Sequence, residues 1–197
     1  MNIPAQKALP DDALKLWLDG KVIEERCMAI SDEEHADFWQ FIDLSHWNGK
    51  EVEVSFEGWS NLEDPLSDVS LDDNIKGLDH LYAEKYRPQF HFSPIQGWSN
   101  DVNGMVYLDG EYHMFYQYDP SQGGQIGRNM HWGHAVSKDL FHWNELPIAL
   151  GTDLQRGQNY SGSAIVDFNN SAGLQEGKEK TLIAFYTLRS PYYLLVH

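Results

Sequence analysis

The chain has 197 residues, of which 14 are basic and 30 acidic, so its formal net charge at pH 7 is −16. A balance this acidic argues against a nucleic-acid partner, because the phosphates would be repelled. No apolar run approaches the roughly 18 residues that span a bilayer, and the single cysteine excludes an intrachain disulfide.

The N-terminal part carries most of the negative charge and predicts short strands. Residues 1–85 hold 7 basic and 20 acidic side chains, whereas residues 86–197 hold 7 and 10. Asp19-Gly20 joins two alternating runs, which indicates a hairpin, and further strands are expected at 37–43 and 51–56. We therefore expect residues 1–80 to form a small β-sandwich-like accessory domain that ends in an acidic connector.

The C-terminal part predicts antiparallel strands linked by turns. Asp109-Gly110 again joins two apolar-polar runs, and Lys138-Asp139 marks a later turn. The expected strands are 105–108, 111–118, 131–137, 141–143, 161–167 and 181–187. No amphipathic helix separates them, so the fold class is all-β, and a sandwich, a barrel and a propeller all fit this pattern.

One polar and aromatic cluster, residues 97–104, stands out just before the expected strand at 105–108. It places Asp101 between Asn100 and Asn103, with Trp98 ahead of it. This pattern is typical of a carboxylate held at the mouth of a sheet, with an aromatic face for stacking on a ligand. An Asx turn that only shapes the bend is the alternative.

His131 and His134 do not form a metal pair in this reading. Residues three apart on a strand lie on opposite faces, so their imidazoles diverge. No phosphate-binding loop and no nucleophile elbow is found either.

Several blocks of the C-terminal part resemble glycoside hydrolase family 32, which includes invertases, inulinases and levanases. The blocks are 86–92, 98–104, 115–117, 129–140 and 160–164, and the resemblance covers about residues 80–187. It implies a five-bladed β-propeller, with residues 81–197 forming its N-terminal blades. Residues 1–80 resemble the β-rich domain that precedes the propeller in some bacterial levanase-like enzymes.

The resemblance also implies a site and a chemistry. The family cleaves β-fructofuranosides with retention, and Asp101 matches its nucleophile. A retaining mechanism needs two carboxyl groups about 5–5.5 Å apart, and donors such as Asn100 favour the ionised form of the first. The residues that match the fructose-binding subsite are Trp98, Ser99, Asn100, Gln117, Trp132, Tyr160 and Ser161. No cofactor and no metal is implied, and the expected partner is a fructan or a sucrose-type carbohydrate.

The sequence departs from the family pattern at three points. Val102 replaces the usual proline, which loosens the backbone beside Asp101. Asp119 stands where the family usually has Asn and is interpreted as a loop residue. The Arg-Asp-Pro and Glu-Cys motifs, which supply the transition-state stabiliser and the acid/base, do not occur in the 197 residues.

We therefore expect a fragment of a longer enzyme that is inactive alone, with the apolar residues 192–197 belonging to an interrupted element. A non-catalytic fructan-binding protein and a degenerate gene remnant are the alternatives, and a fructosyltransferase or an arabinose-directed relative on the same propeller scaffold is a third. Levan, inulin and sucrose remain open as substrates. The full-length form is expected to be extracellular, periplasmic or at the cell surface, although no signal peptide is visible in this chain.

Overall fold

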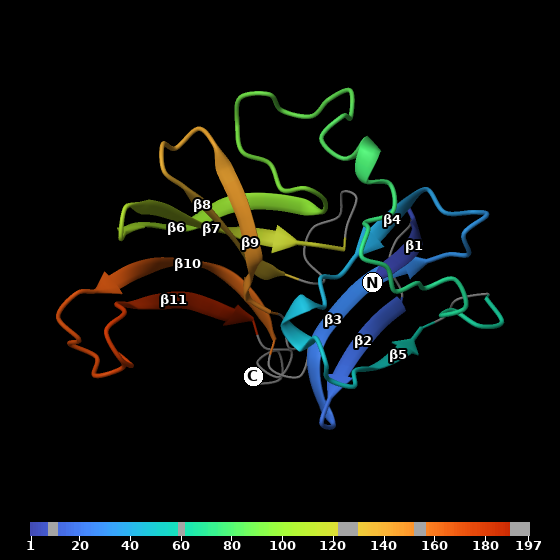
Figure 1. The fold of residues 1–197 in the computed structure, drawn as a ribbon, viewed down its shortest axis with the longest axis horizontal. Coiled ribbons are helices and arrows are strands. Elements are labelled where there is room, and N and C mark those ends of the chain that lie inside the picture. The colour runs from blue at the N-terminus through green and yellow to red at the C-terminus, as the bar shows by residue number, and fades with distance from the viewer. Residues whose placement is uncertain (8–11, 59–61, 122–129, 152–156, 190–197) are drawn as a thin grey trace, which may run out of the picture. The chain divides into compact units, whose positions relative to one another are not determined.

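A computed structural model describes residues 1–7, 12–58, 62–121, 130–151 and 157–189 (Figure 1). In these ranges the protein is built from β-strands with two short 3-10 turns, as the sequence predicts. No helix in this part of the chain is long and apolar enough to cross a membrane. The chain divides into two compact units: one is built mainly on residues 1–87 and the other mainly on 99–118 and 130–189.

The first unit contains a five-stranded sheet with the strand order β4-β1-β3-β2-β5. Its elements are β1 (Asn2–Gln6), β2 (Asp12–Leu18), β3 (Lys21–Ile30), β4 (Phe38–Phe41), η1 (Ser45–Trp47), β5 (Glu53–Glu57) and η2 (Leu78–His80). The expected hairpin joins β2 to β3, and both Asp19 and Gly20 have positive φ, which such two-residue turns require.

The strands of the first unit join in one sheet, where the sequence predicts a two-layered sandwich. β3 pairs with β2 along most of its length and with β1 at its last residues, so it connects the two halves of the sheet. The core beside it includes Ile3, Leu14 and Leu16, none of which is exposed, and it is covered by partly buried side chains from 44–69. These side chains come from β5 itself (Val54 and Phe56) and from segments outside regular strands, so no second sheet covers this core in the described residues.

The second unit contains an antiparallel sheet with the order β6-β7-β8-β9 and a two-stranded sheet of β10 and β11. The strands are β6 (Trp98–Leu108), β7 (Glu111–Asp119), β8 (His131–Ser137), β9 (Trp143–Leu150), β10 (Gln158–Asp167) and β11 (Thr181–Arg189). The strands of the larger sheet follow one another in chain order, so each hairpin lies next to the previous one.

Both faces of the larger sheet are apolar, because alternate side chains on β7 and β8 point to opposite sides. Tyr116 and Ala135 belong to the cluster on one face. Phe115 and Trp132 belong to the cluster on the other face, together with Ala164 of β10. The two-stranded sheet therefore packs against one face of the four-stranded sheet.

Three expectations about these elements need correction. The cluster at 97–104 does not precede a strand, because β6 already begins at Trp98. Asp119 is not a loop residue: it ends β7, is fully buried, and accepts a hydrogen bond from the Ser121 backbone N–H (3.1 Å). The strand expected at 141–143 is β9, which starts only at Trp143. The apolar segment 192–197 lies outside the described residues.

Candidate functional site

Asp101 lies near the start of β6 with its carboxylate exposed and held at both oxygens. The Asn100 side-chain amide donates to Oδ1 (3.1 Å), and the Ser161 hydroxyl of β10 donates to Oδ2 (2.7 Å). Asp101 and Ser161 are 60 residues apart in the chain. The starts of β6 and β10 are thus brought together, and this carboxylate has a defined orientation at the surface.

A buried amide network lies beside this carboxylate. Asn103 follows Asp101 by two residues, so both point to the same face of β6, but Asn103 is only 2% exposed. When its amide is oriented so that donors meet acceptors, the Asn103 oxygen accepts from Trp132 Nε1 (2.9 Å) and from Gln117 Nε2 (2.9 Å) and backbone N (3.1 Å). One side chain of β6 is therefore tied to both β7 and β8.

The same donors reach β10. Gln117 Nε2 also donates to the Asn159 carbonyl (3.1 Å), and Trp132 Nε1 also donates to the Tyr160 carbonyl (3.1 Å). The Asn159 side chain in turn donates to the Gly151 carbonyl (2.8 Å). These bonds hold the backbone of β10 directly before Ser161, so the network positions the hydroxyl that contacts Asp101.

The Tyr160 side chain contacts an arginine at the end of β11. Arg189 donates to the Tyr160 hydroxyl (2.6 Å), and its guanidinium carbon lies 5.6 Å from the centroid of the ring. This pair places an aromatic ring and a cation next to the residue that precedes Ser161.

The structure separates the eight predicted site residues into three groups. Asn100, Asp101 and Ser161 meet through hydrogen bonds at the surface. Gln117 and Trp132 are 3% and 0% exposed, and they engage the amide network instead. Trp98 and Ser99 are the first two residues of β6 and are half-buried, as is Tyr160.

Asn103 is the site residue that the sequence reading did not single out. It is part of the cluster at 97–104, and a strand reading of that segment would have placed it on the face of Asp101 by simple alternation. Val102, which replaces the usual proline, points to the other face of β6 and is 56% exposed.

Two stacked histidines lie on the same sheet. His134 is on β8, two residues after Trp132, and its Nε2 lies 3.0 Å from Nδ1 of His113 on β7. Burial, together with repulsion from His113, lowers the pKa of His134 from 6.5 to about 4. This imidazole is therefore neutral at neutral pH. His131 is fully buried on the other face of β8, as the strand spacing predicts.

No metal site is found in the part of the chain that the structure describes: no three His, Cys, Asp or Glu side chains are grouped so that they could hold an ion.

Comparison with known proteins identifies the second unit. Residues 91–192, about half of the chain, match the N-terminal domain of the glycosyl hydrolases family 32. The chain belongs to this family. The match contains every hydrogen-bonded residue of the site described above, including Asp101, Asn103 and Ser161.

Individual relatives carry names that agree with this assignment. The levanase of Bacillus subtilis (strain 168) is 61% identical over 106 residues, which cover 54% of this chain and 15% of the levanase. The levanase of Bacillus sp. (strain L7) is 52% identical over 176 residues, which cover 88% of this chain and 17% of that protein. The second match therefore also extends into the N-terminal unit.

A fungal relative and a solved structure extend the comparison. The extracellular exo-inulinase of Aspergillus niger is 44% identical over 124 residues, covering 59% of this chain and 22% of the inulinase. The structure of beta-fructofuranosidase from Schwanniomyces occidentalis complexed with fructosyl-erythritol superposes with a TM-score of 0.50 at 37% identity, over 53% of this chain and 21% of that one. The chain thus spans about a fifth or less of the length of these relatives.

The family assignment explains the sheets of the second unit. β6 to β9 form a four-stranded antiparallel sheet of the kind that makes one propeller blade, and β10 and β11 are the first strands of the next. Asp101 and Ser161 lie on the first strands of these two successive sheets, which is why they meet.

Proposed function

We propose that this protein takes part in the hydrolysis of β-fructofuranosides by a retaining mechanism, with Asp101 as the nucleophile. The observation that carries the proposal is the exposed Asp101 carboxylate, in which each oxygen accepts one side-chain hydrogen bond. The names of the relatives, which include levanases and an exo-inulinase, support a fructose-containing substrate.

The chemistry follows from this geometry. One Asp101 oxygen attacks the anomeric carbon of the fructosyl unit, while the bond from that carbon to the leaving oxygen breaks and a second carboxyl group protonates that oxygen. The product is a fructosyl ester of Asp101. Water, deprotonated by the second carboxylate, then cleaves the ester and restores both groups. Asn100 and Ser161 hold the carboxylate in line for attack, so no reorientation is needed.

The other predicted residues divide by their burial. Trp98 and Tyr160 offer ring faces against which a sugar can pack, and Ser99 adds a hydroxyl. Gln117 and Trp132 act as positioning residues through Asn103, because their polar groups are engaged inside the protein.

We infer that the second carboxyl group comes from polypeptide beyond these 197 residues. Two observations support this inference: the chain spans 15% to 22% of the length of the relatives compared, and neither Arg-Asp-Pro nor Glu-Cys occurs in it. In this proposal residues 1–80 form an accessory domain, residues 81–197 form the first blades, and the 197 residues alone do not turn over substrate. The whole protein would act outside the cytoplasm, where polymeric fructans occur and where the exo-inulinase relative is named as extracellular.

The test compares Asp101→Asn with Asp109→Asn. Asp109 is exposed at the tip of the β6–β7 hairpin and has a φ of 50°, which asparagine tolerates. Both variants are made in the 197-residue chain and in the longest polypeptide that its gene encodes, and sugar release from levan, inulin and sucrose is measured. We expect Asp101→Asn to lower the rate of the longer polypeptide by about a thousandfold or more, whereas Asp109→Asn leaves it unchanged.

Two results would overturn parts of this proposal. Full activity in Asp101→Asn would refute the nucleophile assignment. A longer polypeptide that binds fructans without releasing sugar would favour the non-catalytic binding protein instead.

A further inference from the structure

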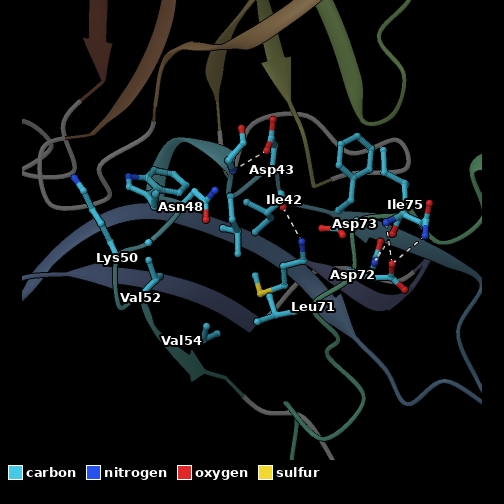
Figure 2. Close-up of a pocket in the computed structure, with 18 of the residues that line it drawn as sticks. Ile42, Asp43, Asn48, Lys50, Val52, Val54, Leu71, Asp72, Asp73 and Ile75 are labelled. Carbon is cyan, nitrogen blue, oxygen red and sulfur yellow. Dashed lines mark hydrogen bonds between the residues drawn. The ribbon is translucent and has the colours of Figure 1, made fainter.

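The first unit contains an open cleft of about 1150 Å³, lined only by residues of that unit (Figure 2). Ligand clefts in proteins usually measure about 300–1,000 Å³, so this one has room for an extended ligand. Its lining comes from the N-terminus of β1, the end of β4 with the η1 segment and the chain that follows to Val54, and the segment 71–75.

The wall at 71–75 is held in place by a buried asparagine. Asn2 of β1 is 1% exposed, and its backbone exchanges two hydrogen bonds with Ser70 (2.8 and 3.0 Å). Its side chain donates to the Asn74 carbonyl (3.0 Å) and accepts from the Lys76 backbone N–H (3.0 Å). Four bonds from one buried residue fix the backbone on both sides of Asp72 and Asp73, so this wall has its shape before any ligand binds.

The carboxylates at the rim are oriented as acceptors. Asp43 Oδ1 accepts from the Ser45 backbone N–H (2.8 Å), and Asp72 Oδ1 accepts from the Asn74 backbone N–H (2.8 Å). These backbone bonds are the main reason that the pKa values of Asp43 and Asp72 lie below the ordinary value. Both groups are therefore ionised at neutral pH and ready to accept hydrogen bonds from hydroxyl groups.

The remaining lining alternates apolar and polar groups. Figure 2 shows Asn48 and Lys50 at one side of the cleft and Asp72 and Asp73 at the other, with Ile42 between them. Trp47, which is half-buried, adds an aromatic ring to the lining. An aromatic face with ionised acceptors and amide donors around it matches a ligand that has both ring faces and many hydroxyl groups.

The charge of the rim narrows the ligand class. The lining holds four carboxylates, Asp43, Glu51, Asp72 and Asp73, against two cationic groups, the Lys50 side chain and the Met1 ammonium, so the net charge is negative and an anionic ligand would be repelled. The polar groups around the rim would be desolvated without compensation by a purely apolar ligand. A neutral polyhydroxylated chain satisfies both conditions.

We propose that this cleft binds a fructan oligosaccharide as a second carbohydrate site, separate from Asp101. The choice of fructan among neutral saccharides rests on the proposed function. The evidence that the cleft suits a neutral saccharide, namely its shape, its fixed wall and its acceptors and aromatic surface, comes from the first unit alone and does not depend on the proposed function. Such a site would raise the local concentration of polymer near the catalytic unit of the same protein.

The test is isothermal titration of the 197-residue chain with inulin-type and levan-type fructo-oligosaccharides in an Asp101→Asn background, which excludes any attack by that carboxylate. Trp47→Ala removes the ring. Asp72→Asn removes a charge but keeps the acceptor for the Asn74 backbone N–H, so it preserves the local fold. Asp109→Asn, on the second unit, is the matched control for loss of one exposed carboxylate. We expect at least tenfold weaker binding for the two cleft variants and unchanged binding for the control.

Two results would overturn the proposal. The first is equal affinity in the parent, Trp47→Ala and Asp72→Asn, with all three showing the same thermal unfolding. The second is a parent chain that binds neither oligosaccharide at millimolar concentration. Both results leave the Asp101 proposal intact, because that proposal is judged by sugar release from the longer polypeptide. If Asp101→Asn abolishes sugar release but binds the oligosaccharides as tightly as the chain that keeps Asp101, the two sites are separate.

Discussion

Replacing Asn103 by leucine tests the buried amide network most directly. Leucine has nearly the same shape, so the main change is the loss of three hydrogen bonds to the Asn103 oxygen, two from Gln117 and one from Trp132. A buried hydrogen bond contributes about 1 kcal/mol net. Gln117 Nε2 and Trp132 Nε1 keep second acceptors on β10, so neither side chain is left without a partner. Because the single Trp132 N–H proton is shared between Asn103 and the Tyr160 carbonyl, its bond is only partly lost, and we expect a total loss of about 2–3 kcal/mol.

The assay is urea unfolding followed by near-ultraviolet circular dichroism, with Asn144→Leu as the control. Asn144 is an exposed asparagine on β9, so the same substitution there should change the free energy of unfolding by less than about 0.5 kcal/mol. A loss for Asn103→Leu as small as that of the control would refute the reasoning, because it would mean that the network contributes no net stability.

Two further predictions concern the same unit. Gly104→Ala should destabilise it by about 1–3 kcal/mol in urea unfolding, because a Cβ there would lie 2.6 Å from the Ala164 backbone N and 2.9 Å from its Cβ. The control is Gly151→Ala, which should be neutral because a Cβ there would have nothing within 4 Å. Equal effects of the two substitutions would contradict the close approach of β6 to β10. The stability that depends on neutral His134 should be fully present above pH 6.5 and lost as the pH falls towards about 4, because the pKa in the folded protein lies below the unfolded value. The full shift would be worth roughly 3 kcal/mol, and partial exposure reduces this to about 1 kcal/mol. His134→Gln should therefore reduce the loss of unfolding free energy between pH 7 and pH 4.5, measured by urea unfolding, by about 1 kcal/mol. An unaltered pH profile would contradict the assignment.

The turns were readable from the sequence because their requirements are local. Asp19-Gly20 and Asp109-Gly110 both adopt positive φ at each residue, and this conformation is strongly favoured by these two residue types whatever surrounds them. The all-β class follows in the same way from short alternating runs between such turns. β1 was not predicted, because Ile3-Pro4-Ala5 is buried on both faces and therefore has no apolar-polar alternation to read.

Asp101 and Ser161 show how much of the site could be predicted from the sequence. Motif resemblance selected both residues, yet their hydrogen bond joins positions 60 residues apart, and no local pattern specifies that distance. The contact depends on β10 packing against the four-stranded sheet, where Gly104 leaves room for Ala164. The different environments of Asn100 and Asn103, one exposed and one buried, also depend on that packing.

The sequence by itself therefore determined the all-β class with its turns, the family and the residue types of the site, since these are set by local conformational preference and by motif. Only the tertiary structure decided that Gln117 and Trp132 are buried and engaged with Asn103, that Asp119 is buried, and that the first unit contains a rimmed cleft. Burial and hydrogen-bond partnership arise from contacts between strands distant in the chain, and the energy of such contacts is not encoded in any one segment.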